Sequence, residues 1–270
     1  MAFKDILVHV DNSARARVRL KLAAALARIE NGHLVALHVR GQTELPPYIA
    51  AQVGPEIIQM QQRVHEQAAA EARALFDAVA VAQGFTSEWR DVEGNVAEVL
   101  ALHARYADLT VIGQSEPDEQ APGMAEALTL EVGRPVLVVP YAGTFSAVGE
   151  RVMVAWNASR EATRAVHDAL PLLRRARRTH VLTINPEGHG DIPGADICLH
   201  LSRHGVKAEC EAVSCDDLSA GQMLLSRAAD MGADLIVMGA YGGSRLRRLV
   251  LGGATGHLLR HMTVPVLFSH

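Results

Sequence analysis

The sequence predicts two α/β domains in tandem, each built around a five-stranded parallel sheet. Two observations support this prediction. Short apolar runs alternate with helical patterns along the chain, which is typical of β-α-β units. The second half also repeats the first, because the segment Asp5–Leu26 aligns with Arg151–Leu172 without a gap, at an offset of 146 residues (5 to 151). A chain of 270 residues is long enough for two domains of ordinary size.

The ends of the two halves match as well. ADLTVIGQ in the first half corresponds to ADLIVMGA in the second, and RPVLVVP corresponds to VPVLFSH. The segment between the copies, Tyr141–Glu150, is small and polar, as a linker is. We therefore expect one domain over residues 1–141 and a second over residues 150–270.

In the first half, strands are expected near residues 4–10, 33–39, 86–91, 109–113 and 135–139. Ser13 is the predicted N-cap of the first helix, and Pro55 is expected to open a long helix that runs to about residue 82. Asn95 is the predicted N-cap of the third helix, and a short fourth helix is expected near 124–132.

In the second half, strands are expected near residues 151–156, 180–185, 206–213, 234–239 and 264–269. The second helix is shorter here, around 194–204. Runs such as ILVHV, LTVIG and LIVMG are apolar on both faces, which a parallel strand covered by helices requires. Any ligand is then expected at the carboxyl ends of the strands.

Composition excludes several classes of partner. The formal net charge is −4 and aromatic residues make up 4% of the chain, which provides neither a basic surface nor many rings for stacking on bases. We expect no nucleic-acid partner and no membrane partner.

Lys4 and Asp5 interrupt what a secretory signal would need as its apolar run, so we expect a cytoplasmic protein. The three cysteines are expected to be reduced thiols.

A glycine-rich segment, MGAYGGSRLRRLVLGGATGHLLRH, follows the predicted strand LIVMG. Two residues separate Gly239 from Gly242, and nine separate Gly242 from Gly252. Glycines let backbone N–H groups approach an anion, and the helix that follows presents its positive dipole end. Thr255 can add a hydroxyl. The arginines of SRLRRLV fit two interpretations, contact with phosphate or pairing with neighbouring carboxylates.

The tandem halves, the ILVHVD opening, the ADLIVMGAYG strand and the spacing G-x2-G-x9-G before a helix and VPVL resemble the universal stress protein family. The resemblance covers essentially the whole chain. It implies two Rossmann-like (adenine nucleotide alpha hydrolase-like) three-layer α/β/α domains packed as a pseudo-twofold dimer, with PVLVV and PVLFS meeting at the interface. In family members that bind ATP, this loop binds the ribose and phosphates.

The resemblance therefore implies a stress-response binding or signalling module with a site for ATP, with Mg, or for another nucleotide in the second half. The residues it assigns to that site are Ala155, Asn157, Ile184, Gly239, Gly242, Gly252, Gly253, Ala254 and Thr255. Gly253 stands where the family usually has Ser or Thr, and Asn157 stands where it commonly has Asp. Losing one hydroxyl weakens a phosphate site by roughly 0.5–1.5 kcal/mol, which does not abolish it.

The first half is expected to carry a degenerate phosphate loop and no ATP site. Only Gly113 matches a motif glycine, and Pro122 stands opposite Gly252 without an N–H to donate. The loop also carries three acidic side chains that would oppose phosphate, Glu116, Asp118 and Glu119.

Two other functions remain open at this point. P-loop, GxGxxG and GxSxG motifs are absent, so we predict no catalytic residues and at most weak ATP hydrolysis. Alternatively, the protein is a ligand-free scaffold whose long helix binds a partner protein. Beyond the internal pseudo-dimer, two chains can associate as a homodimer, which the sequence does not decide.

Two histidine pairs have the spacing of helical metal ligands. They are His200 with His204 and His257 with His261. Neither has the glutamate of HExxH, and a chain with 13 histidines produces such spacings by chance. We therefore expect no metal site.

Overall fold

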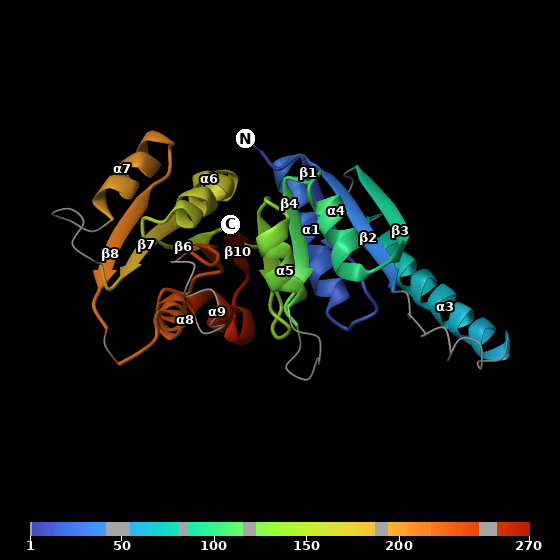
Figure 1. The fold of residues 1–270 in the computed structure, drawn as a ribbon. Coiled ribbons are helices and arrows are strands. Elements are labelled where there is room, and N and C mark those ends of the chain that lie inside the picture. The colour runs from blue at the N-terminus through green and yellow to red at the C-terminus, as the bar shows by residue number, and fades with distance from the viewer. Residues whose placement is uncertain are drawn as a thin grey trace.

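The computed structural model describes residues 2–41, 55–80, 86–115, 123–186, 194–215, 217–242 and 253–270. The strands in these residues form one ten-stranded sheet in the order β3-β2-β1-β4-β5-β10-β9-β6-β7-β8. They are β1 (Asp5–His9), β2 (His33–Gly41), β3 (Ser87–Gly94), β4 (Leu109–Gly113), β5 (Val136–Val139), β6 (Arg151–Ala155), β7 (Arg178–Ile184), β8 (Ala208–Val213), β9 (Leu235–Gly239) and β10 (Val266–Ser269). Figure 1 shows the two halves side by side, blue to green and yellow to red.

Helices cover both faces of the sheet. They are α1 (Ala16–Glu30), α3 (Pro55–Ala80), α4 (Val96–Ala104), α5 (Met124–Glu131), α6 (Arg160–Arg175), α7 (Ala195–Arg203), α8 (Ala220–Asp230) and α9 (Ala254–His261). One hydrophobic core lies under α1, α3, α6 and α7, and the other lies under α4, α5, α8 and α9. The predicted three-layer α/β/α architecture is therefore confirmed.

The two halves join through their last strands. All neighbouring strands are parallel except β5 and β10, which pair antiparallel with Leu137 opposite Leu267 and Val136 opposite Phe268. These side chains are fully buried. Antiparallel pairing of equivalent strands is what a twofold relation between the halves requires. The predicted meeting of PVLVV with PVLFS at a pseudo-twofold interface is confirmed.

The helix caps agree with the sequence in one case and differ in another. Asn95 caps α4, since its side chain accepts hydrogen bonds from two backbone N–H groups of the first turn. The prediction for Ser13 is wrong, because α1 begins at Ala16 and its N-cap Arg15 makes no side-chain cap bond. The Ser13 hydroxyl donates instead to Asp11 Oδ1 at 2.6 Å. A nearby carboxylate thus competes for the hydroxyl that the helix end would have used.

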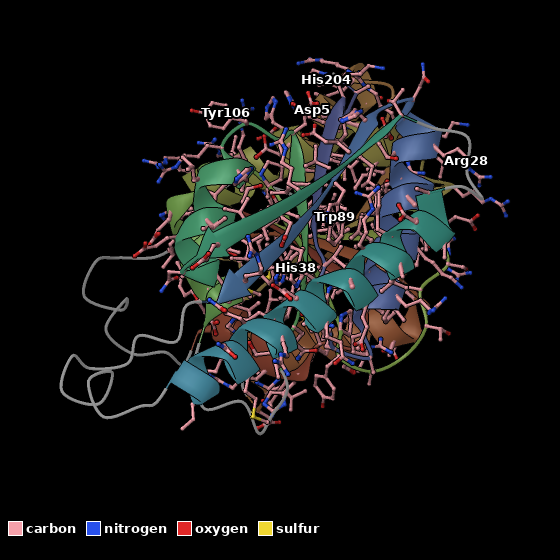
Figure 2. The ribbon with its side chains drawn as sticks, turned by 90° about the vertical axis from the view of Figure 1, so that its right-hand side faces the viewer. Asp5, Arg28, His38, Trp89, Tyr106 and His204 are labelled. Carbon is pink, nitrogen blue, oxygen red and sulfur yellow. The ribbon has the colours of Figure 1, made fainter. Side chains whose placement is uncertain are left out.

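The long helix α3 crosses the face of the first half and extends past the edge of the sheet (Figure 2). Its C-terminal part is anchored by Phe76, which packs on Trp89 at 5.6 Å between ring centroids, and Trp89 in turn stacks on His38 at 5.9 Å. Within the described residues, no helix has the length and apolar character needed to cross a membrane.

Candidate functional site: a cavity at the strand ends of the second half

A cavity of about 510 Å³ opens at the carboxyl ends of β6, β7 and β9, next to the first turns of α8 and α9. This is the edge of a parallel sheet at which the sequence predicts a ligand. Five of the nine predicted site residues line it, namely Ala155, Asn157, Ile184, Gly239 and Ala254. Gly242, Gly253 and Thr255 are not among its lining residues, and Gly252 lies outside the described residues.

The turn after β6 shapes one wall. Asn157 Oδ1 accepts the backbone N–H of Ser159 at 3.2 Å, and Ala158 between them adopts a positive φ of 56°. Ser159 then caps α6 by accepting the N–H of Ala162 at 3.1 Å. The Asn157 side chain therefore builds the turn through its oxygen, while its NH₂ group remains available at the cavity.

The turn after β7 is fastened to the turn after β8. The Asn185 amide donates to the Cys215 carbonyl at 2.9 Å and accepts the Cys215 N–H at 2.7 Å. Asn185 also adopts a positive φ of 47°, which asparagine tolerates better than most residues. This double hydrogen bond ties the backbone beside Ile184 to the turn after β8.

Sequence reasoning missed other lining residues, among them Trp156, Thr183, Leu224 and Met238. Thr183 is 7% exposed, and its Oγ1 has no hydrogen-bond partner in the part of the chain that the structure describes. The repeat alignment could have indicated Trp156, which lies between two predicted site residues. Leu224 comes from α8 and could be found only from the fold.

The motif glycines at the end of β9 have a packing role. A Cβ on Gly239 would lie 2.4 Å from the backbone nitrogen of Ala162 and 2.8 Å from Glu161 Cβ. A Cβ on Gly242 would lie 2.9 Å from Ser159 Oγ. Gly239 therefore needs glycine because the backbone at the N-terminus of α6 packs directly against it, whereas the atoms near Gly242 belong to side chains that can move. The sequence pattern predicts that these glycines let an anion approach the backbone. The structure shows that the start of α6 lies close to them.

The N-terminus of α9 borders the cavity at Ala254. Gly253 is its N-cap and provides no side-chain cap, and none of the described residues outside its chain neighbours has a heavy atom within 4 Å of the point where its Cβ would stand. Thr255 is 6% exposed, and its Oγ1 accepts the N–H of Tyr241 at 3.1 Å. The first N–H groups of this helix have no carbonyl partner within the helix, so they favour a negative charge. The arginines Arg245, Arg247 and Arg248 lie outside the described residues.

The equivalent place in the first half is filled by an ion pair. The 146-residue offset relates Arg19 to Ala165 and Asp11 to Asn157. Arg19 is 4% exposed, and its Nη2 lies 2.5 Å from Asp11 Oδ1. A Cβ on Gly113 would lie 2.6 Å from Arg19 Nη1. The arginine side chain therefore occupies space that small residues leave open in the second half.

Two histidines complete this filling. His9 corresponds to Ala155 by the same 146-residue offset. His38 corresponds to Thr183, because His38 follows the β2 residue paired with His9 and Thr183 follows the β7 residue paired with Ala155. His38 Nδ1 lies 2.8 Å from Asp91 Oδ1. Burial lowers the pKa of His9 to about 4, an effect that Arg19 and His38 strengthen and Asp11 opposes. His9 is therefore a neutral side chain in the folded protein near neutral pH.

Fold and cavity together define a tandem Rossmann-like protein with a cavity at the strand ends of its second half. The model of the universal stress protein family matches residues 2–140 and again residues 149–270, so the chain belongs to the universal stress protein family. The predicted family assignment is confirmed.

Two solved structures agree on the fold. A universal stress protein from Archaeoglobus fulgidus matches with a TM-score of 0.76 and 16% identity over 98% of this chain and 95% of its own. A putative universal stress protein from Pseudomonas aeruginosa matches with a TM-score of 0.58 and 16% identity over 99% and 93%. A universal stress protein solved in complex with cAMP matches 53% of this chain and all of its own, with a TM-score of 0.37 and 20% identity. No curated protein matches the sequence.

Proposed function

We propose that the protein is a stress-response binding and signalling module whose second half binds ATP, with Mg, or another nucleotide at the strand-end cavity. The observation that carries the proposal is a cavity of about 510 Å³ lined by five of the nine residues that the family resemblance assigns to the nucleotide. The filled counterpart in the first half supports a single site per chain, since Arg19 occupies the corresponding space.

The chemistry of the walls fits the two ends of a nucleotide. Ile184, Leu224 and Met238 present apolar surface that suits a flat base. The N-terminus of α9 at Ala254 suits phosphate, because its free N–H groups and dipole favour negative charge. Asn157 brings no negative charge near a polyanion, unlike the Asp that is common in the family. This chemistry supports an orientation with the base toward β7 and α8 and the phosphates toward α9.

The test uses a charge placed at the proposed phosphate end. Ala254→Glu puts a carboxylate in the first turn of α9, where it stabilises the helix but repels phosphate. Ala254→Gln is the neutral control of the same shape. Thermal unfolding and titration calorimetry are measured with and without about 1 mM Mg-ATP, since a ligand at one hundred times its Kd stabilises the native state by roughly 2.7 kcal/mol.

We expect Mg-ATP to raise the Tm of the wild type and of Ala254→Gln, and to leave Ala254→Glu unchanged. Equal binding by both variants would show that phosphate does not lie at α9. No shift and no heat in any of the three proteins would reject nucleotide binding by this cavity.

A scaffold function is the second candidate, and it is favoured by the surface of α3. Ile57, Met60 and Val64 are spaced along one face of this helix and are 52%, 68% and 56% exposed. A scaffold predicts that replacing Met60 by Gln abolishes capture of a partner while Mg-ATP changes neither stability nor capture.

A further inference from the structure

Three histidines gather in the second half on the face opposite α8 and α9. His200 and His204 lie one turn apart on α7, and His167 comes from α6. Their ring centroids are 4.6 Å apart for His200 and His204, 5.2 Å for His167 and His200, and 6.0 Å for His167 and His204. Of these three histidines, the four-residue spacing in the sequence identifies only His200 and His204, because His167 lies on another helix, α6.

We propose that His167, His200 and His204 form a binding site for a divalent first-row transition metal ion of the Zn²⁺, Co²⁺ or Ni²⁺ type. The separations fit such a site. A metal–nitrogen distance of about 2.0–2.1 Å, extended by the radius of an imidazole ring, places each centroid about 3.2 Å from the metal. Two rings at a tetrahedral angle then have centroids about 5.2 Å apart. Of the three observed separations, one equals this value, one is 0.6 Å shorter and one is 0.8 Å longer.

Ring orientation is the part that metal binding must change. The rings are inclined to one another by 54°, 55° and 77°, and within the described ranges no three His, Cys, Asp or Glu side chains already stand as metal ligands. His167 is exposed, so its ring can turn without disturbing the core. His200 Nε2 is buried and has no hydrogen-bond partner among the described residues, so a metal would satisfy an atom that they leave unpaired.

The donor set also selects the class of metal. Imidazole nitrogens suit zinc, cobalt, nickel and copper, whereas magnesium and calcium require oxygen ligands. The Arg174 Nε donates to the His204 carbonyl at 3.0 Å, which places a positive charge beside the group. This charge weakens the binding of every divalent cation, so the affinity must come from the metal–imidazole bonds. Exposure of His167 leaves room for water as the fourth ligand.

The experiment titrates the full, untagged chain with Co²⁺, whose tetrahedral complexes absorb visible light, and then displaces it with Zn²⁺. His167→Gln removes the proposed ligand that only the packing of α6 on α7 brings to the other two histidines. His204→Gln removes one that the sequence spacing already indicates. His257→Gln is the matched control, because His257 and His261 on α9 form a two-histidine pair with the same centroid separation of 4.6 Å.

We expect one Co²⁺ per chain in the wild type and in His257→Gln, and at least about a tenfold weaker affinity in His167→Gln and His204→Gln. Circular dichroism is used to show that all four proteins are folded. Wild-type affinity in His167→Gln would reduce the site to the α7 pair and overturn the proposal. Loss of binding in His257→Gln alone would show that the metal binds at α9 and would overturn the proposal. The absence of saturable Co²⁺ binding in the wild type would reject the proposed site.

Discussion

The ion pair between Arg19 and Asp11 is predicted to be energetically coupled in the folded first half. The Arg19 side chain is 4% exposed and the Asp11 side chain is 37% exposed. Breaking a buried pair costs about 3–5 kcal/mol, and breaking an exposed one costs about 0–1 kcal/mol. Because Asp11 is more than a third exposed, we expect Asp11→Asn to lower the free energy of unfolding by about 2 kcal/mol.

A double-mutant cycle measures the coupling directly. Arg19→Ala loses packing but also removes the cation that Asp11→Asn leaves unpaired. The double variant, which copies the residues of the second half, is therefore expected to cost about 1–2 kcal/mol less than the sum of the two single changes.

Urea unfolding is the assay, followed by Trp89 fluorescence in a Trp156→Phe background, since the chain has two tryptophans, one in each half. Additivity of the two changes within about 0.5 kcal/mol would refute the claim that these groups act as a pair.

Three further predictions concern single positions. The pKa of His9 is lowered from 6.5 to about 4 in the folded state, so the unfolded chain binds the proton more tightly and stability falls as the pH drops from about 6.5 to about 4. His9→Gln should flatten this part of the stability curve, by about 3 kcal/mol between the two pH values, and an unchanged slope in urea titrations would contradict it. Gly239→Ala should destabilise the second half by about 3 kcal/mol or more, because its Cβ would meet the Ala162 backbone at 2.4 Å, and an unchanged Tm would contradict the packing role of this glycine. Gly253→Ser fits without contact and restores the hydroxyl that the family usually has, so calorimetry should show nucleotide binding tighter by roughly 0.5–1.5 kcal/mol with the same Tm in the absence of ligand. Weaker binding would mean that the hydroxyl does not reach phosphate.

Much of the fold follows from the sequence because its signals are local. Each predicted strand overlaps an observed one, and Asn95 caps α4 as expected, since a cap depends only on residues of the first helical turn. Ser13 shows the limit of the same reasoning, because the Asp11 carboxylate takes its hydroxyl.

The site was less predictable because its details depend on contacts between distant segments. Gly239 carries a motif signal, but its tight contact is with the N-terminus of α6, which precedes it by more than 70 residues. Arg19 has the pattern of a surface charge, and only the folded arrangement buries it against Asp11. The approach of His167 to the α7 pair likewise needs the packing of two helices.

The pairing of β5 with β10 within one chain has a consequence for how the two halves can differ. When such an interface joins two separate identical chains, every change appears twice and assembly depends on protein concentration. Here a covalent linker of about ten residues holds the partners together, so the local concentration of one half around the other stays high at any dilution. Each half is then free to accept its own substitutions. In the first half, Arg19 fills the space at the strand ends, whereas the second half has a cavity there. The molecule is therefore asymmetric in a way that a symmetric dimer of one sequence is not.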